Sequence, residues 1–202
     1  TLRAGLNGTY DYVSYSTPIE KNKWYHVAVS FDDAANTMIL YVNGEQVSVN
    51  NSISTSFTLD AGEPMYIGSH SGNVTMNYVP SSLFKGNIDE VRIWAVARTA
   101  AEIKNNMNAE FCSKQNGLRA YYKFNHGVAN GTNTVNKLSD WSGYNNTGTT
   151  LNFLMSGTGS NWVNGKTLTR SLNTFVNTTT QCDYYYGPTG KKLTVSDERG
   201  LK

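Results

Sequence analysis

Charged side chains are scarce in this chain. Asp, Glu, Lys and Arg make up 16% of its 202 residues, against about a quarter in an average globular protein. The 17 basic and 15 acidic residues nearly cancel, to a net charge of +2, and are scattered along the chain. A protein without a strong field of one sign has little long-range attraction for nucleic acid or for an anionic membrane. We therefore expect neither nucleic acid nor a membrane among its partners.

Cysteine is also scarce. The two cysteines, Cys112 and Cys182, form no CxxC pair and have no His at metal-ligand spacing, which argues against a zinc site. In an oxidising compartment the pair can form one disulfide, but the two cysteines are 70 positions apart, which leaves open whether their Cα atoms come close enough.

Long hydrophobic runs are also missing. No stretch approaches the roughly 18 consecutive apolar residues of a membrane-spanning helix, and the first thirty residues show no export-signal pattern. We expect a soluble chain, with any export signal outside it. Its 202 residues are enough for one large domain or two small ones with a proper core.

The chain does contain short segments of period-two alternation, which are typical of half-buried strands. In residues 24–31, Tyr25, Val27, Val29 and Phe31 form an apolar face, and Trp24, His26, Ala28 and Ser30 form a mixed one. Asn43-Gly44 joins residues 38–42 to 45–49 and predicts a type I′ hairpin, because both residues tolerate positive φ. Further strands are predicted at 64–68, 88–94, 118–124 and 151–154. This spacing is typical of a β-sandwich.

One helix is predicted at 99–108. Thr99 and Glu102 form a capping box, in which each side chain satisfies a free amide of the first turn. Ile103 and Met107 follow at i, i+4 spacing and make a short apolar stripe.

Three segments then carry a specific order and spacing: residues 24–32 read WYHVAVSFD, 40–45 read LYVNGE and 84–94 read FKGNIDEVRIW. Together they resemble the laminin-G-like, concanavalin A-like jelly-roll domains of large secreted bacterial proteins. Residues 117–125 (GLRAYYKFN) and 140–148 (DWSGYNNTG) resemble the segment that accompanies such domains in surface proteins of Bacteroidota. The resemblance covers about 160 residues.

The resemblance implies an all-β fold, a two-sheet antiparallel jelly-roll sandwich with one short helix. Family members usually begin some tens of residues earlier, so we expect the N-terminal strands to be missing from this chain, which would be a piece of a longer protein. We predict one domain over residues 1–164. Residues 165–202 are interpreted as a linker or the start of a following module.

Catalysis is not expected. Related β-glucan hydrolases carry three carboxylates at i, i+2 and i+5 of one strand, so that alternate residues enter one cleft. The nearest match, Asp89-Glu90, places adjacent acids on opposite faces of a strand, and no further acid follows before Glu102. No His lies in a recognisable nucleophile motif, so we predict that the chain is not an enzyme.

Calcium is the predicted cofactor, in a structural role. Asp140, Ser142, Gly143 and Asn146 form a turn rich in oxygen ligands, which Ca²⁺ prefers. In the resembling family this turn and the Asp of the Ile-Asp-Glu-Val strand are commonly near a structural calcium, which implies Asp140 and Asp89 as ligands. The alternative is an Asx-turn that caps its own backbone, with Asp89 hydrogen-bonded to a loop.

The predicted ligand site is the polar loop 69–82, because aromatic faces stack on sugar rings while amide side chains bond hydroxyl groups. Its candidate residues are Tyr78, Asn77, His70 and Asn73. Tyr10, Tyr12 and Tyr15 alternate on an early strand, but half-buried strand positions with hydroxyl groups in water are the favoured explanation for each of them. Trp24, Trp94 and Trp162 are expected in the core.

These features favour a non-catalytic recognition or adhesion module of a large exported cell-surface protein, which binds carbohydrate or another surface ligand. Its other partners would be neighbouring domains of the same protein. The alternatives are a structural spacer in a surface adhesin or filament, and an accessory domain of a glycan-degrading enzyme. The fold alone does not decide among them, because one sandwich serves all three roles.

Overall fold

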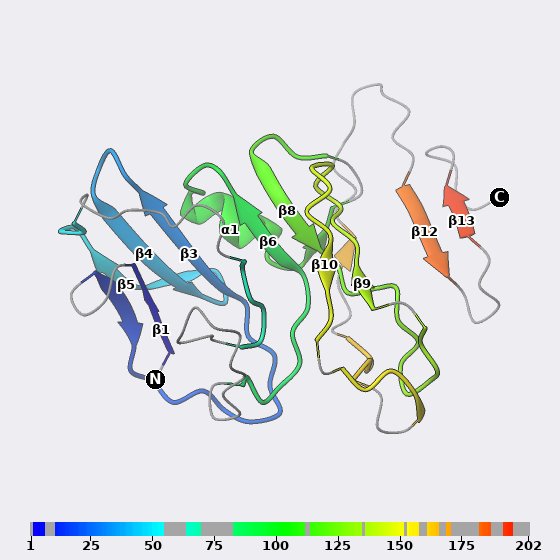
Figure 1. Ribbon diagram of the computed structural model, residues 1–202. Helices are drawn as coiled ribbons and strands as arrows, with labels where there is room; N and C mark the ends of the chain where they lie inside the picture. The colour runs from blue at the N-terminus through cyan, green and yellow to red at the C-terminus, as the bar shows by residue number, and fades with distance from the viewer. Residues whose placement is uncertain are drawn as a thin grey trace.

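The computed structural model is built mostly from antiparallel strands, with one short helix among the described residues (Figure 1). It describes residues 2–6, 11–54, 64–69, 83–111, 114–134, 136–151, 153–157 and 161–165, and the backbone of 169–170, 182–186 and 192–195. The elements are β1 (Leu2–Gly5), β2 (Tyr12–Tyr15), β3 (Val27–Asp32), β4 (Thr37–Val42), β5 (Glu45–Asn50), β6 (Val91–Trp94), α1 (Ala100–Asn106), β7 (Ala109–Glu110), β8 (Leu118–Tyr122), β9 (Lys137–Leu138), β10 (Gly148–Thr149), β11 (Thr169–Arg170), β12 (Cys182–Tyr186) and β13 (Lys192–Val195).

The predicted hairpin is confirmed as β4–β5, and β4 is the central strand of the three-stranded sheet β3–β4–β5. Asn43 and Gly44 turn the chain with φ values of 53° and 79°, as a type I′ turn requires. The Asn43 side chain accepts a hydrogen bond from the His26 backbone amide at 3.0 Å, which ties the turn to the residue before β3.

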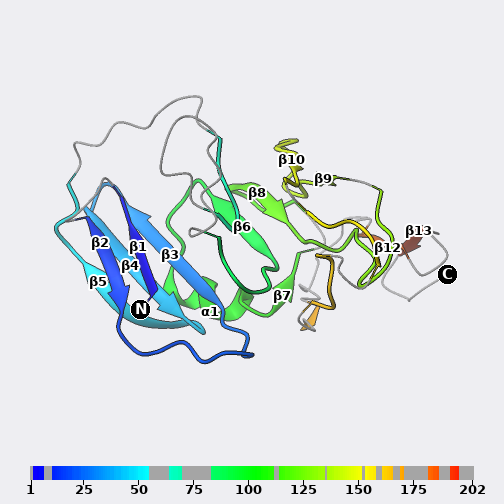
Figure 2. The ribbon, with the colours of Figure 1, turned by 60° about the horizontal axis from the view of Figure 1, so that its bottom comes forward.

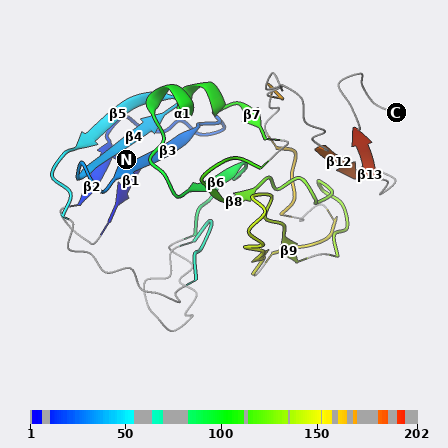
Figure 3. The same ribbon diagram turned by 90° about the horizontal axis from the view of Figure 1, so that it is seen from above.

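The two faces of this sheet are covered by different elements, as Figures 2 and 3 show. On one face the β1–β2 hairpin packs over β4 and β5, and Val13 joins Met38 and Leu40 in a buried cluster. On the other face lies α1, so the mixed face of β3 points toward the helix and the residues before it. Because β2 packs over β4 and β5, Val27 and Val29 on the apolar face of β3 stay about half exposed.

Helix α1 begins as predicted. Thr99 is its N-cap, and the capping box with Glu102 is complete. Ile103 is buried, and Gly44 lies so close beneath the helix that an added Cβ would be 3.2 Å from the Lys104 Cα. The helix is therefore packed directly on the hairpin turn between β4 and β5.

A second region is built on the antiparallel pair β6–β8, both faces of which are covered. Ala120 and Tyr122 pack with Leu138 and Trp162 in one buried cluster, and Tyr121 packs in a second cluster of β8 and its neighbours. Short pairs extend this region: β9 with β10 antiparallel and β7 with β11 parallel. Strands β12 and β13 form an antiparallel pair further along the chain.

The all-β, antiparallel fold class with a short helix is confirmed, and the arrangement is consistent with a concanavalin A-like sandwich. The described strands are distributed over six small sheets, of which five are antiparallel, rather than over two continuous ones. The domain boundary at residue 164 stays a prediction. Strand β11 lies beyond that boundary and pairs with β7, so this part of the chain returns to the β6–β8 region.

Two strands are shorter than predicted. The strand expected at 88–94 begins at Val91, because Glu90 adopts a positive φ of 55° that interrupts extended backbone. The strand expected at 118–124 ends at Tyr122, before Phe124 with a φ of 54°. Such left-handed conformations are uncommon outside glycine, and neither was visible as a sequence pattern.

Two predicted strands are wrong. Residues 64–68 form no strand, and the adjacent Ser69 makes an isolated bridge to Leu83. The described residues of 151–154 are also outside strands, and Leu151 is exposed. The strand in this part of the chain is β10, which ends at Thr149, two residues before the predicted start. Among the tryptophans, Trp162 is buried and Trp94 is half-buried, but Trp24 is exposed because it precedes β3.

Candidate functional site

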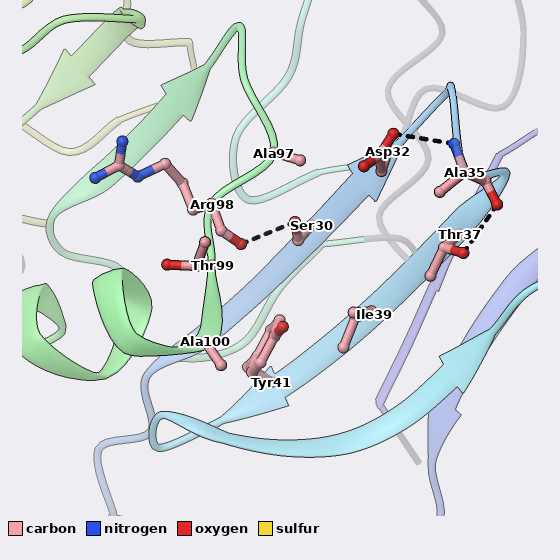
Figure 4. A pocket seen from close by; sticks show the side chains of 10 residues that line it. All are labelled: Ser30, Asp32, Ala35, Thr37, Ile39, Tyr41, Ala97, Arg98, Thr99 and Ala100. Carbon is pink, nitrogen blue, oxygen red and sulfur yellow. Dashed lines mark hydrogen bonds between the residues drawn. The ribbon is translucent and has the colours of Figure 1, made fainter.

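The mixed face of β3 and β4 lines a groove of about 370 Å³, which we call the β3–β4 groove (Figure 4). Alternate residues of a strand share a face, so Ser30 and Asp32 on β3 lie beside Ile39 and Thr37 on β4. The described residues that line it are Ser30, Asp32, Ala35, Thr37, Ile39, Tyr41, Ala97, Arg98, Thr99 and Ala100.

The residues before α1 form the wall of the groove. The Ser30 hydroxyl donates to the Arg98 carbonyl at 3.0 Å, which attaches this wall to β3. The Arg98 side chain points away from the groove (Figure 4). Its guanidinium pairs with Glu102 at 2.9 Å and lies 4.3 Å from the centre of the Trp94 ring. The positive charge of Arg98 therefore does not face the groove.

The open end of the groove is polar. The Asp32 carboxylate is exposed, and one of its oxygens accepts from the Ala35 amide at 3.1 Å. The Thr37 hydroxyl donates to the Ala35 carbonyl at 3.0 Å. These short-range bonds orient a carboxylate and a hydroxyl side by side at the turn that joins the two strands.

The other end is aromatic. Tyr41 is 2% exposed and lines the groove from β4. The Tyr41 hydroxyl is protonated at neutral pH, and burial raises its pKa further. A carboxylate, hydroxyl groups and an aromatic ring in one shallow groove can bind a polyhydroxylated ligand. Among the described residues of the lining there is one carboxylate, whereas glycoside hydrolysis needs a pair.

The sequence analysis did not select these residues. The signal was nonetheless present, because Ser30 belongs to the mixed face of the alternating segment and Asp32 continues that face. A polar face on a central strand suggests a use other than packing, but the sequence does not show what covers it.

The predicted calcium residues come together in part. Asp140, Ser142 and Asn146 lie in one turn, where Ser142 is fully buried. The Asp140 carboxylate accepts four hydrogen bonds of 2.8–2.9 Å, from the backbone amides of Tyr121, Ser142 and Asn146 and from the Ser142 hydroxyl. Burial disfavours the Asp140 charge, but these donors more than compensate and lower its pKa.

This geometry is the Asx-turn that the sequence analysis kept as the alternative. Four donors fill the roughly four lone-pair positions of a carboxylate, so in this arrangement Asp140 does not fit a metal ion. Asp89 accepts a hydrogen bond from the Glu90 amide at 3.0 Å, and an added Cβ on Gly165 would be 2.5 Å from its other oxygen. Within the described ranges, no three His, Cys, Asp or Glu side chains gather into a metal-binding group. Calcium stays a prediction.

The same turn exposes two aromatic side chains, Trp141 and Tyr144. Both rings are already close to cations: Lys123 lies 4.5 Å from the Trp141 ring centre, and Arg119 lies 4.8 Å from that of Tyr144. These rings already make cation–π contacts, whereas the groove brings a carboxylate and hydroxyl groups together in one depression, so we take the β3–β4 groove as the candidate site. The predicted ligand residues Tyr78, Asn77, His70 and Asn73 lie outside the described residues.

Glu90, one of the two acids considered for catalysis, is held in a buried network. Its carboxylate accepts from Arg92 at 2.6 Å and from the Tyr121 hydroxyl at 2.5 Å. Arg92 also donates to the carbonyls of Asn106 and Ala109. Burial raises the pKa of Glu90, and the bonds from Tyr121 and Arg92 offset this only in part. The network joins β6 and β8 to the segment after α1, which is a structural use of the acid.

Comparisons with known proteins agree with this fold. A sequence model of the concanavalin A-like lectin/glucanases superfamily matches residues 1–104. The crystal structure of a candidate carbohydrate-binding protein from Bacteroides ovatus ATCC 8483 is similar, with a TM-score of 0.54 and 29% identity over 70% of this chain and 38% of that chain. No curated protein matches.

A second crystal structure is also similar in sequence. It is residues 221–444 of an S-layer domain-containing protein from Clostridium thermocellum ATCC 27405, with a TM-score of 0.37 and 31% identity over 50% of this chain and 48% of that chain. This chain therefore spans less than half of either solved chain. No helix in the described parts of the structure has the length and apolar character needed to cross a membrane.

Proposed function

Because the chain belongs to the concanavalin A-like lectin/glucanase superfamily, we propose that it is a non-catalytic carbohydrate-binding module of an exported cell-surface protein. The observation that carries the proposal is the β3–β4 groove, a shallow depression that is lined on its sheet side by the exposed Asp32 carboxylate and the Thr37 hydroxyl at one end and by the buried Tyr41 at the other. The Bacteroides ovatus protein, described as a candidate carbohydrate-binding protein, supports the same class of ligand.

The superfamily also contains glucanases, and two features favour binding over hydrolysis. A single carboxylate lines the groove among its described residues, while a glycosidase needs an acid and a second carboxylate on opposite sides of the bond. The buried acid Glu90 is held by Arg92 and Tyr121 rather than presented to a ligand.

A glycan array tests the proposal. The chain, confirmed as folded by circular dichroism, is applied in calcium-containing buffer and again with EDTA, and the bound glycans are then incubated with it to measure released reducing ends. We expect binding to a restricted set of glycans and no release of sugar. A folded chain that binds no glycan would favour the structural-spacer alternative, and release of reducing ends would contradict the non-catalytic assignment.

The EDTA arm also tests the proposed structural calcium at Asp140 and Asp89. A calcium ion bound to the folded chain alone raises its melting temperature. An Asx-turn held by its own hydrogen bonds predicts equal melting temperatures in calcium and EDTA. Equal values would remove calcium from the proposal without affecting the carbohydrate site.

A further inference from the structure

The charges around the β3–β4 groove define the class of carbohydrate that fits it. Among the described residues that line the groove, Asp32 carries the one negative charge and Arg98 the one positive charge. The guanidinium of Arg98 is directed away, onto Glu102 and the Trp94 ring. The charge that faces a ligand is therefore negative.

We infer that the β3–β4 groove selects neutral or amino-bearing saccharides and rejects acidic ones, such as uronates and sialylated or sulfated glycans. This inference rests on the proposed carbohydrate-binding function and assigns its site and ligand class. A carboxylate accepts hydrogen bonds from sugar hydroxyl groups and attracts an ammonium group, whereas it repels a second carboxylate or a sulfate at short range.

Asp32 is held in place for this role. One carboxylate oxygen is anchored by the Ala35 amide at 3.1 Å, and its other oxygen accepts no hydrogen bond from a described residue. The turn around it is fixed by Asn36, which adopts a φ of 51° and donates from its amide to the Asp33 carbonyl. An oriented acceptor loses little conformational entropy when a ligand binds.

The groove is long enough for more than one sugar ring. Asp32 pairs with Thr37, and Tyr41 pairs with Ala28, four residues further along the ladder. At about 3.3 Å per residue, the acidic and aromatic ends lie about 13 Å apart along the strands. A ligand whose hydroxyl groups bond to Asp32 can therefore extend along the groove toward the end that Tyr41 lines.

Selectivity is tested on an array that carries neutral, amino-bearing and acidic oligosaccharides at equal density. Affinities are then measured by calorimetry for matched tetramers: β-1,4-linked mannose against β-1,4-linked mannuronate, and β-1,4-linked glucose against β-1,4-linked glucosamine. The proteins are the native chain, Asp32→Asn and the matched control Asp33→Asn. Asp33 is the exposed neighbour on the same turn and does not line the groove.

We expect array binding confined to neutral and amino-bearing members. Asp32→Asn keeps the oxygen that accepts from Ala35 but loses the charge, so its affinity for the neutral ligand should fall about tenfold. Its preference for glucosamine over glucose should shrink, and Asp33→Asn should match the native chain. Ala97→Phe, which fills the groove from its wall, should abolish binding, while Ala95→Phe outside the lining should not.

Each contrary result has a distinct meaning. Preferred binding of acidic members would overturn the inferred ligand class and leave the proposed function standing. Equal binding by Asp32→Asn, Ala97→Phe and the native chain would show that carbohydrate binds elsewhere on the protein. Absence of all carbohydrate binding would overturn the proposed function and this inference together. Urea unfolding of each variant confirms that it is folded.

Discussion

The β3–β4 groove and the β6–β8 region use the same kinds of polar side chain in opposite ways. In the groove, Asp32 accepts one hydrogen bond from a described residue and remains exposed. In the β6–β8 region, Asp140 accepts four hydrogen bonds, and Glu90 is buried between Arg92 and Tyr121. A carboxylate whose acceptor positions are filled by its own chain stabilises the fold, and one with free positions can bind a ligand.

The largest effect that would test this comparison is expected from Arg92→Ala. Removal of the guanidinium leaves the Glu90 charge and the carbonyls of Asn106 and Ala109 without their donor. The free energy of unfolding in urea should fall by about 3–5 kcal/mol, as expected for a broken buried ion pair. Lys23→Ala is the control, since its pair with Glu20 is exposed and should contribute nothing measurable. Equal losses in both variants would contradict the structural role of the network.

The next largest effect is expected from Asp140→Ala, which leaves the backbone amides of Tyr121, Ser142 and Asn146 without their acceptor, while the Ser142 hydroxyl keeps the Arg119 carbonyl. We expect a loss of about 2 kcal/mol in urea unfolding, because partly buried donors lose their partner. Thr147→Ala, an exposed change in the same turn, is the matched control. A loss of carbohydrate affinity without a loss of stability would assign the turn to binding instead.

The two acids of this region should show opposite pH dependence. The pKa of Asp140 is lowered from its usual 3.8, so its contribution to stability is present above that value and is lost as the pH falls through the folded-state pKa. The pKa of Glu90 is raised from 4.5, so stability falls as the pH rises from there through the folded-state pKa.

Urea unfolding measured across this pH range separates the two contributions. Asp140→Asn should flatten the loss of stability at acidic pH, and Glu90→Gln should flatten the decline on the other side. If either variant reproduces the native pH profile, the acid concerned carries no linked stability.

The smallest effect on stability is expected in the groove. Asp32→Asn should change the free energy of unfolding by no more than about 0.5 kcal/mol, as is usual for exposed substitutions, because the bond from Ala35 is kept. Urea unfolding checks this value. A loss comparable to that of Asp140→Ala would show that Asp32 is a structural acid as well, and the contrast between the two regions would disappear.

Local patterns were predictable from the sequence wherever neighbouring residues alone decide the structure. The type I′ turn at Asn43-Gly44 and the capping box of Thr99 and Glu102 are both confirmed. The Asx-turn at Asp140 was anticipated as an alternative to calcium. Most of the hydrogen bonds that form these three features join atoms a few residues apart, so the residue types and their spacing are enough to predict them.

Strand limits and burial were less predictable. Glu90 and Phe124 adopt positive φ, although neither residue type favours that region. Trp24 was expected in the core and is exposed, and the apolar Val27 and Val29 are half exposed because the β1–β2 hairpin covers the other strands. Such outcomes depend on which elements meet in space, a long-range property that alternation along one strand does not contain.

The sequence by itself determined the all-β class, the short capped helix and the family resemblance, because hydrophobic period, turn chemistry and ordered motifs are local features of the chain. Only the tertiary structure decided how far each carboxylate is saturated, since the Tyr121 amide that completes the set of donors to Asp140 comes from β8, and the wall of the groove comes from residues 97–100. Hydrogen-bond satisfaction is a property of packed neighbours, and it separates Asp140 and Glu90, which are held within the fold, from Asp32, for which we propose a role in ligand binding.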